Sequence, residues 1–81
     1  MNEAQLAQCR AFIKEYAQAL HTQGIEEAQA QVLVRKATST HIATVICAFD
    51  AATDTNLIAL AIKGAVLAAY HPEKMFVVTM G

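Results

Sequence analysis

The sequence predicts a small α+β domain, a three-stranded sheet with two packed helices in the order α-β-β-α-β, and three observations favour this fold class. Apolar residues near the N-terminus recur at alternating spacings of three and four, which indicates a helix. Two central segments alternate or are rich in β-branched residues, and the last apolar run is too short for a helix. An all-α helical bundle is the alternative, because residues 25–52 also place apolar side chains at helical spacing.

The first helix has recognisable start and stop signals. Asn2 followed by Gln5 resembles a capping box, in which each side chain bonds the other residue's backbone amide. Gly24 suits the left-handed position just after a helix, and Ile25 then falls where it can contact the last turn. Between these signals one apolar seam runs along the helix, formed by Leu6, Cys9, Ile13, Tyr16 and Leu20.

Two strands are expected in the ambiguous centre of the chain. From Ala28 to Val34 the apolar residues favour one parity, which is the period of a strand. The run Thr40–Phe49 is crowded with β-branched side chains, which pack well on a pleated surface. We expect a polar turn at Lys36–Ser39 to join the two strands.

The C-terminal half is expected to add a helix and a third strand. A loop at Asp50–Asp54 precedes a second helix, Leu57–Tyr70, which should stop near His71 because the residue before Pro72 disfavours helical geometry. Met75–Met80 is expected to be a strand covered on both faces. A strand, a helix and a strand in one sheet form a right-handed crossover with parallel strands.

The second helix carries little polarity apart from Lys63, so we expect it to be buried on more than one side. Gly64 costs a helix interior about 1 kcal/mol relative to alanine. Because that cost needs a compensation, we expect another backbone to approach closely at Gly64.

Composition predicts a single domain, residues 1–81, that associates with itself. The chain is 56% hydrophobic and 16% charged, more apolar than a typical soluble domain. A chain of this length buries a limited share of its surface alone, so a second copy is the expected cover for the surplus. We expect a homo-oligomer whose self-association residues are Leu57, Leu60, Ala61, Gly64, Ala65, Ala68, Phe76 and Val78.

Charge and targeting signals narrow the partners. The net charge is −1 and no basic cluster occurs, so neither nucleic acid nor an anionic membrane is an expected partner. The N-terminus lacks the layout of a secretory signal, and a cytoplasmic location is expected. Cys9 and Cys47 lie among apolar residues and are expected to be small buried hydrophobes without a disulfide framework.

Catalysis, metal ions and other cofactors are not expected. Cys47 has no neighbouring base to activate it, and a tertiary metal site of His41, Cys47 and Asp50 is less favoured than a core thiol beside a surface histidine. Asp50 and Asp54 suit turn formation and helix capping without any substrate. The three histidines lie too far apart in the sequence for any two of them to show the short spacing of metal ligands: His21, His41 and His71.

An anion site is the one polar site that the sequence suggests. The run from Arg35 to His41 offers two cations and several hydroxyl groups at a predicted turn, although a solvated turn shows the same pattern. The candidate anion-binding residues are Arg35, Lys36, Thr38, Ser39, Thr40 and His41.

Two functional hypotheses follow. The favoured one is a small non-catalytic interaction or assembly protein, a homodimer that binds or blocks a larger macromolecular partner, as accessory proteins of bacteria or their phages do. The alternative is a protein that binds or sequesters a small ligand, with an anion site near the Arg35–His41 turn. An enzyme using Asp50, Asp54, His41 or His71 is the least favoured class.

Overall fold

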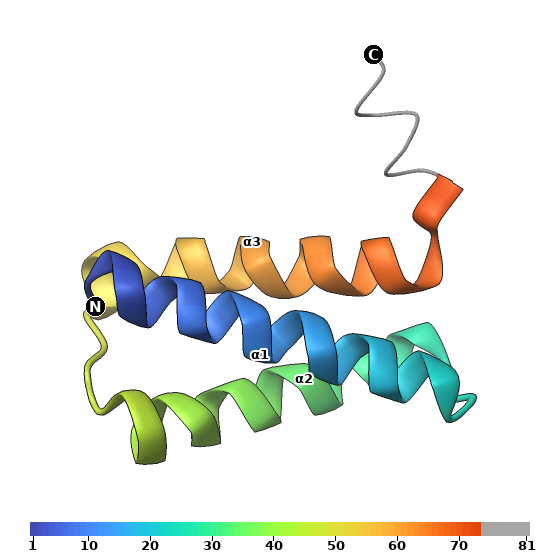
Figure 1. Ribbon diagram of the computed structural model, residues 1–81, viewed down its shortest axis with the longest axis horizontal. Helices are drawn as coiled ribbons and strands as arrows, with labels where there is room; N and C mark the ends of the chain where they lie inside the picture. Colours follow the sequence, from blue (N-terminus) through green and yellow to red (C-terminus); the bar gives the residue numbers. More distant parts are fainter. Residues whose placement is uncertain (74–81) are drawn as a thin grey trace.

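The computed structural model describes residues 1–73 and is all-helical over that range. It contains α1 (Glu3–Thr22), α2 (Glu27–His41), a π-helical turn η1 (Ile42–Ile46) and α3 (Ala51–Tyr70). α1 packs against both other helices and crosses in front of them in Figure 1. The molecule is flat, 34 × 30 × 18 Å. Because a helix with its side chains is about 10–12 Å across, much of each helix surface faces solvent.

The predicted α+β fold is wrong for the described residues, which contain no strand; they form the helical bundle that was the alternative. The expected strand at residues 28–34 and the expected turn at Lys36–Ser39 both lie inside α2, and the expected strand at Thr40–Phe49 includes the end of α2 and η1. The expected strand Met75–Met80 lies outside the described residues. The expected right-handed crossover between two parallel strands is therefore not formed within residues 1–73.

Burial explains why the central segment is helical. The buried residues of α2 and η1 recur every four positions: Ala30, Val34, Thr38, Ile42 and Ile46. A strand would have placed the intervening even positions Val32, Lys36, Thr40 and Thr44 on the same buried face, but all four are exposed, so this stripe needs a helical turn. The propensity cost of β-branched residues in a helix is at most about 0.7 kcal/mol each. Packing the stripe against α1 and α3 outweighs that cost.

The threonines of the expected turn and the expected strand are also satisfied inside the helix. The Thr38 hydroxyl donates to the Val34 carbonyl at 2.7 Å, and the Thr44 hydroxyl donates to the Thr40 carbonyl at 2.7 Å. The Thr40 hydroxyl makes the same bond to the Lys36 carbonyl at 3.2 Å. These bonds to the preceding turn give each hydroxyl a hydrogen-bond partner within the helix.

The expected start and end of the first helix are confirmed. The Gln5 amide donates to Asn2 Oδ1 at 2.8 Å and the Asn2 amide donates to Gln5 Oε1 at 2.9 Å, which completes the capping box. Gly24 has a φ of +81°, and the Ile25 amide donates to the Leu20 carbonyl at 3.1 Å. This is the Schellman geometry that the sequence indicates.

α3 begins at Ala51, earlier than the expected Leu57, because Asp50 Oδ1 accepts a hydrogen bond from the Ala52 amide at 2.9 Å and caps the helix.

One core joins the three helices. Its side chains from the two long helices also recur every three or four positions: Cys9, Ile13, Ala17 and Leu20 from α1, and Ile58, Ile62 and Val66 from α3.

Ile13→Ala should lower the free energy of unfolding by about 2–5 kcal/mol, because the Ile13 side chain is fully buried and its removal leaves a cavity. Urea denaturation at one protein concentration measures the change. Val45→Ala is the control, since Val45 is 55% exposed and its loss should cost less than about 0.5 kcal/mol. Equal costs for the two variants would contradict the assigned core.

Candidate functional site

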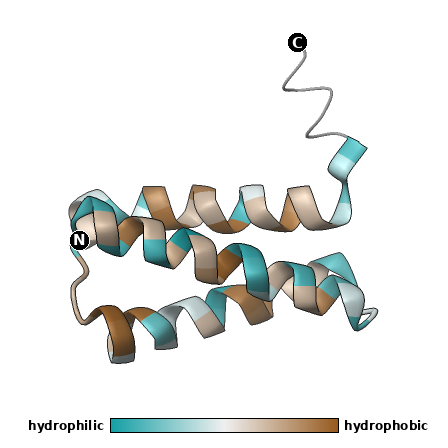
Figure 2. Cartoon of the chain, in the orientation of Figure 1, coloured by the Kyte–Doolittle hydropathy of each residue, from teal (hydrophilic) through white to brown (hydrophobic). Residues whose placement is uncertain are grey.

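The outward side of α3 carries an apolar strip that the described residues leave partly uncovered. We call it the outer seam; it comprises Leu57, Leu60, Gly64 and Leu67, at spacings of three, four and three. Leu60 is 66% exposed and Leu57 is 39% exposed. The core stripe of α3 lies on its other side. Figure 2 shows hydrophobic colouring along most of the length of α3. Because exposed leucines and core residues alternate along it, this helix is apolar on two sides and covered on one.

Gly64 lies in open space at the middle of the outer seam. A Cβ atom built at this position meets no atom within 4 Å. The close approach that the sequence analysis expected at Gly64 is therefore not made by any residue between 1 and 73. Its propensity cost stays uncompensated inside the described chain.

The other expected self-association residues divide between the seam and the core. Ala61 and Ala65 are half-buried and pack against the core, while Ala68 is half-buried on the same helix. Phe76 and Val78 lie outside the described residues. The structure thus leaves Leu57, Leu60 and Gly64 as the expected residues that are available to another chain.

A second feature is an apolar groove between the end of α2 and the first half of α3. It consists of two adjoining cavities of about 400 and 540 Å³ that share Ser39, Ile42 and Phe49. We call it the α2–α3 groove. The loop after η1 returns from α2 to α3 at this end of the molecule (Figure 1). The further lining residues of the smaller cavity are Arg35, Thr38, Thr55, Ile58, Ala59 and Ile62.

The candidate anion-binding residues do not converge on one point. They occupy consecutive positions of α2, where each residue turns by about 100° from the last. Thr38 is buried and uses its hydroxyl within the helix, whereas Arg35 and Ser39 are exposed and line the α2–α3 groove beside it. Lys36, Thr40 and His41 do not line the groove.

The histidines have separate structural settings. The His41 ring stacks on Phe12 with centroids 4.2 Å apart, and its Nε2 is buried with no hydrogen-bond partner in the described part of the chain. His21 meets the edge of Tyr70, while His71 Nε2 lies 2.8 Å from Glu27 Oε1. Among residues 1–73 no group of three or more His, Cys, Asp or Glu side chains is placed to hold a metal ion.

The two cysteines differ, which corrects one expectation. Cys9 is fully buried, and burial raises the pKa of its thiol. Cys47 is exposed instead of buried, because it ends η1 in the left-handed conformation, with a φ of 56°. Its thiol lies 3.5 Å from the Ala43 carbonyl oxygen and lines the larger cavity of the groove.

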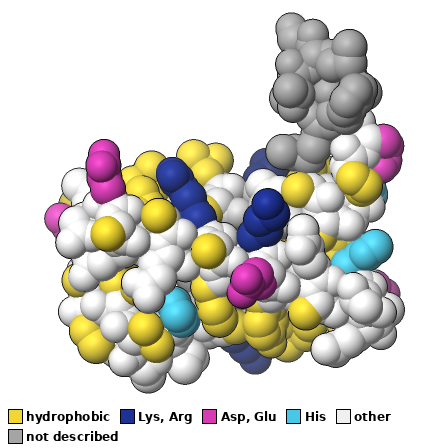
Figure 3. All heavy atoms as spheres, in the orientation of Figure 1, with side chains coloured by type: hydrophobic (Ala, Val, Ile, Leu, Met, Phe, Trp, Pro, Cys, Tyr) yellow, Lys and Arg dark blue, Asp and Glu magenta, His cyan; other side chains and the backbone are white. Residues whose placement is uncertain are grey.

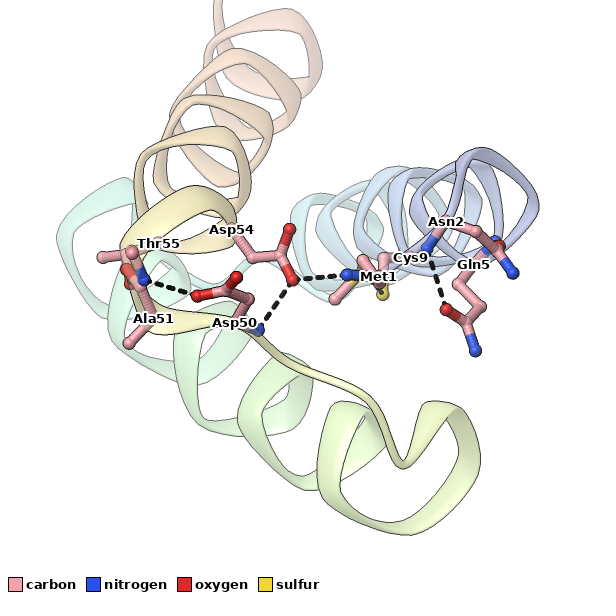
Figure 4. Close-up of polar contacts among 9 residues, drawn as sticks. Met1, Asn2, Gln5, Cys9, Asp50, Ala51, Asp54 and Thr55 are labelled. Carbon is pink, nitrogen blue, oxygen red and sulfur yellow. Dashed lines mark hydrogen bonds and ion pairs between the residues drawn. The ribbon is translucent and has the colours of Figure 1, made fainter.

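A buried ion pair fixes the start of α3, and the sequence analysis missed it. Asp54 Oδ2 accepts hydrogen bonds from the Met1 amino group at 2.8 Å and from the Asp50 amide at 2.9 Å (Figure 4). The Met1 amino group is the main cause of the lowered pKa of the Asp54 carboxyl. Asp54 is 3% exposed. A lone acidic residue in the first turn of an apolar helix was the available signal, although nothing in the sequence connects it to Met1.

The other end of α3 is tied to the start of α2. The Tyr70 hydroxyl donates to the Ile25 carbonyl at 2.6 Å, and burial raises the pKa of that hydroxyl. The contact between His71 and Glu27 lies beside it. Both ends of α3 are therefore held by polar contacts, while its outer seam makes none.

By length and composition, α3 is the one helix of residues 1–73 that could cross a membrane. The core helix of a soluble protein passes the same test. Ile58, Ile62 and Val66 give α3 a place in the core of this domain. Figure 3 shows hydrophobic side chains among dispersed charged ones on the face of the molecule that it draws.

Comparison of the chain with protein-family models, with curated proteins and with solved structures finds no match. The outer seam and the α2–α3 groove are thus the features from which a function can be argued. The outer seam is one face of α3, and the α2–α3 groove is a hollow beside that helix.

Asp54→Asn should destabilise the fold at neutral pH, because it removes the charge that pairs with the Met1 amino group. The folded-state pKa of Asp54 lies below the unfolded value, so the ion pair stabilises the fold above about pH 4 and stops doing so as the pH falls through the folded value. Thermal unfolding between pH 7 and pH 2 should show the gap between wild type and variant closing in acid.

Glu15→Gln is the control for that comparison, because Glu15 is exposed and makes no ion pair with residues 1–73. It should leave the acid profile unchanged. A gap between wild type and Asp54→Asn that is as wide at pH 2 as at pH 7 would show that the charge of Asp54 is not what stabilises the fold.

Proposed function

We propose that this protein is a small non-catalytic interaction protein, which pairs with a second copy through the outer seam of α3 and binds or blocks a larger macromolecular partner. The proposal depends on the outer seam, an apolar strip with two exposed leucines on a helix whose other side is already in the core.

The spacing of the outer seam supports a helix of a second copy as its cover. Residues at spacings of three and four form the strip along which two helices pair, with side chains of one helix entering hollows of the other. Leu57 and Leu60 are the projecting side chains, and the open space at Gly64 is the hollow. The projecting leucines and the hollow lie on the same strip. The strip of one copy can therefore fit against the same strip of a second copy, as a two-fold dimer requires.

Pairing would also resolve the two unfavourable features of the monomer. It would remove Leu60 from water, and burial of a leucine side chain is worth about 1.5–3 kcal/mol. It would bring a neighbour to Gly64, whose missing side chain permits close approach. A lipid bilayer could cover Leu60 as well, but it would gain nothing from the open space at Gly64.

The aspartates and histidines of residues 1–73 have structural contacts, which supports binding as the mode of action. Within residues 1–73 the aspartates cap or fix α3, and the histidines stand apart from one another. The exposed faces of α1 and α2 stay free when α3 pairs, so a dimer would present two copies of each face to a partner. Two linked sites raise apparent affinity without any new contact.

Leu60→Lys should convert the dimer into a monomer of 8.7 kDa, because a charge at the centre of the seam would be buried without a partner. Sedimentation equilibrium at micromolar concentration should show a dissociation constant raised about tenfold or more. Val32→Lys is the matched control, since Val32 is similarly exposed but lies on α2, outside the seam. A monomeric wild type would overturn the proposed dimer. If the protein instead bound lipid vesicles in a Leu60-dependent way, the partner of the outer seam would be a membrane surface.

Gly64→Ala should affect folding and pairing in opposite directions. In the Leu60→Lys background the added methyl group meets open space, so the free energy of unfolding should rise by about 1 kcal/mol. In the wild-type background the same methyl group should obstruct the second copy and weaken the dimer several-fold. Denaturation and sedimentation measure the two effects, and an unchanged dimer would exclude Gly64 from the interface.

A further inference from the structure

The floor of the α2–α3 groove is made of buried aliphatic side chains, and one wall is an aromatic ring. Ile42, Ile58 and Ile62 form the floor, each with less than a tenth of its surface exposed, and Phe49 stands half-exposed beside them. The two cavities, of about 400 and 540 Å³, each lie in the size range of small-molecule sites. The groove can therefore take an apolar chain or ring.

The one charged group of the groove is on α2, beside a serine hydroxyl. Arg35, Ser39 and Ile42 follow one another at spacings of four and three, so they share the helix face that borders the groove. Arg35 makes no ion pair with any of residues 1–73. The lining contains no acidic side chain. An anionic group at this edge would meet a guanidinium that can donate two parallel hydrogen bonds to it.

We propose that the α2–α3 groove binds a small amphipathic anion, whose apolar part lies over Ile42, Ile58 and Ile62 and whose carboxylate or phosphate group meets Arg35 and Ser39. Neither feature suffices alone, because a lone surface arginine is solvated and a lone apolar hollow has no preference for charge. The site is separate from the outer seam, since Thr55 and Ala59 border the groove while Leu57, Leu60 and Gly64 occupy another face of α3. It does not depend on the proposed dimer.

Octanoate and octanol are the probes, because they share an apolar chain and differ in the anionic group. Isothermal calorimetry and thermal unfolding of the full chain should show saturable binding of octanoate, with a melting temperature that rises with its concentration. Octanol should bind several-fold more weakly. Arg35→Gln should reduce octanoate affinity about fivefold and leave octanol unchanged. Arg10→Gln, which removes an exposed arginine on α1, should change neither.

Ala59→Phe tests the apolar part of the site. Ala59 is exposed and lines the groove, so a larger ring there should fill the space while leaving the core residues in place. The variant should keep its cooperative unfolding and lose binding of both probes. No saturable binding of octanoate, equal affinity for octanoate and octanol, or retention of full affinity in Arg35→Gln would each overturn the proposal.

Discussion

The burial of one apolar stripe of α1 between α2 and α3 holds the domain together. The four buried residues of that stripe belong to the apolar core, and α1 packs against both other helices. With helices of ordinary width in a body 18 Å thick, the three helices cannot also cover their outer surfaces. The exposed apolar side chains on α2, η1 and α3 follow from this flat arrangement.

The flat arrangement affects α3 most, because this helix is apolar on two sides. Its polar contacts are at its ends: Asp54 pairs with the Met1 amino group at one end, and Tyr70 bonds the Ile25 carbonyl at the other. These contacts fix the two ends of α3, and apolar packing alone holds the residues between them. A helix held in this way can present Leu60 and Gly64 to a second chain without any rearrangement of the core.

α1 could be predicted from the sequence because every local signal agreed. The capping box at Asn2, the apolar seam and the left-handed Gly24 all specify the same helix. α2 could not, because its signals conflict. Alternating apolar residues and β-branching favour a strand, whereas the helix depends on burial of Val34 and Thr38 against α1 and α3, which is a tertiary effect.

The candidate sites divide in the same way. A candidate seam at Leu57, Leu60 and Gly64 could be suggested from the sequence because a surplus of apolar residues along one helix is a local property, and its pairing with a second chain stays a prediction. The groove could not, since it exists where α2, η1 and the start of α3 diverge. The pairing of Asp54 with Met1 joins residues 53 positions apart, and no local pattern reports such a contact.

The first half of α3 connects the ion pair, the seam and the groove. Leu57 and Leu60 face outward there, and Ile58 and Ala59 border the groove on neighbouring positions of the same turns. The placement of these turns is set by the Asp50 cap and by the bond from the Met1 amino group to Asp54. A shift of this end of the helix would therefore move both surfaces together. Since they occupy different faces, the proposed second copy on the seam and the proposed anion in the groove would not compete for the same residues of α3.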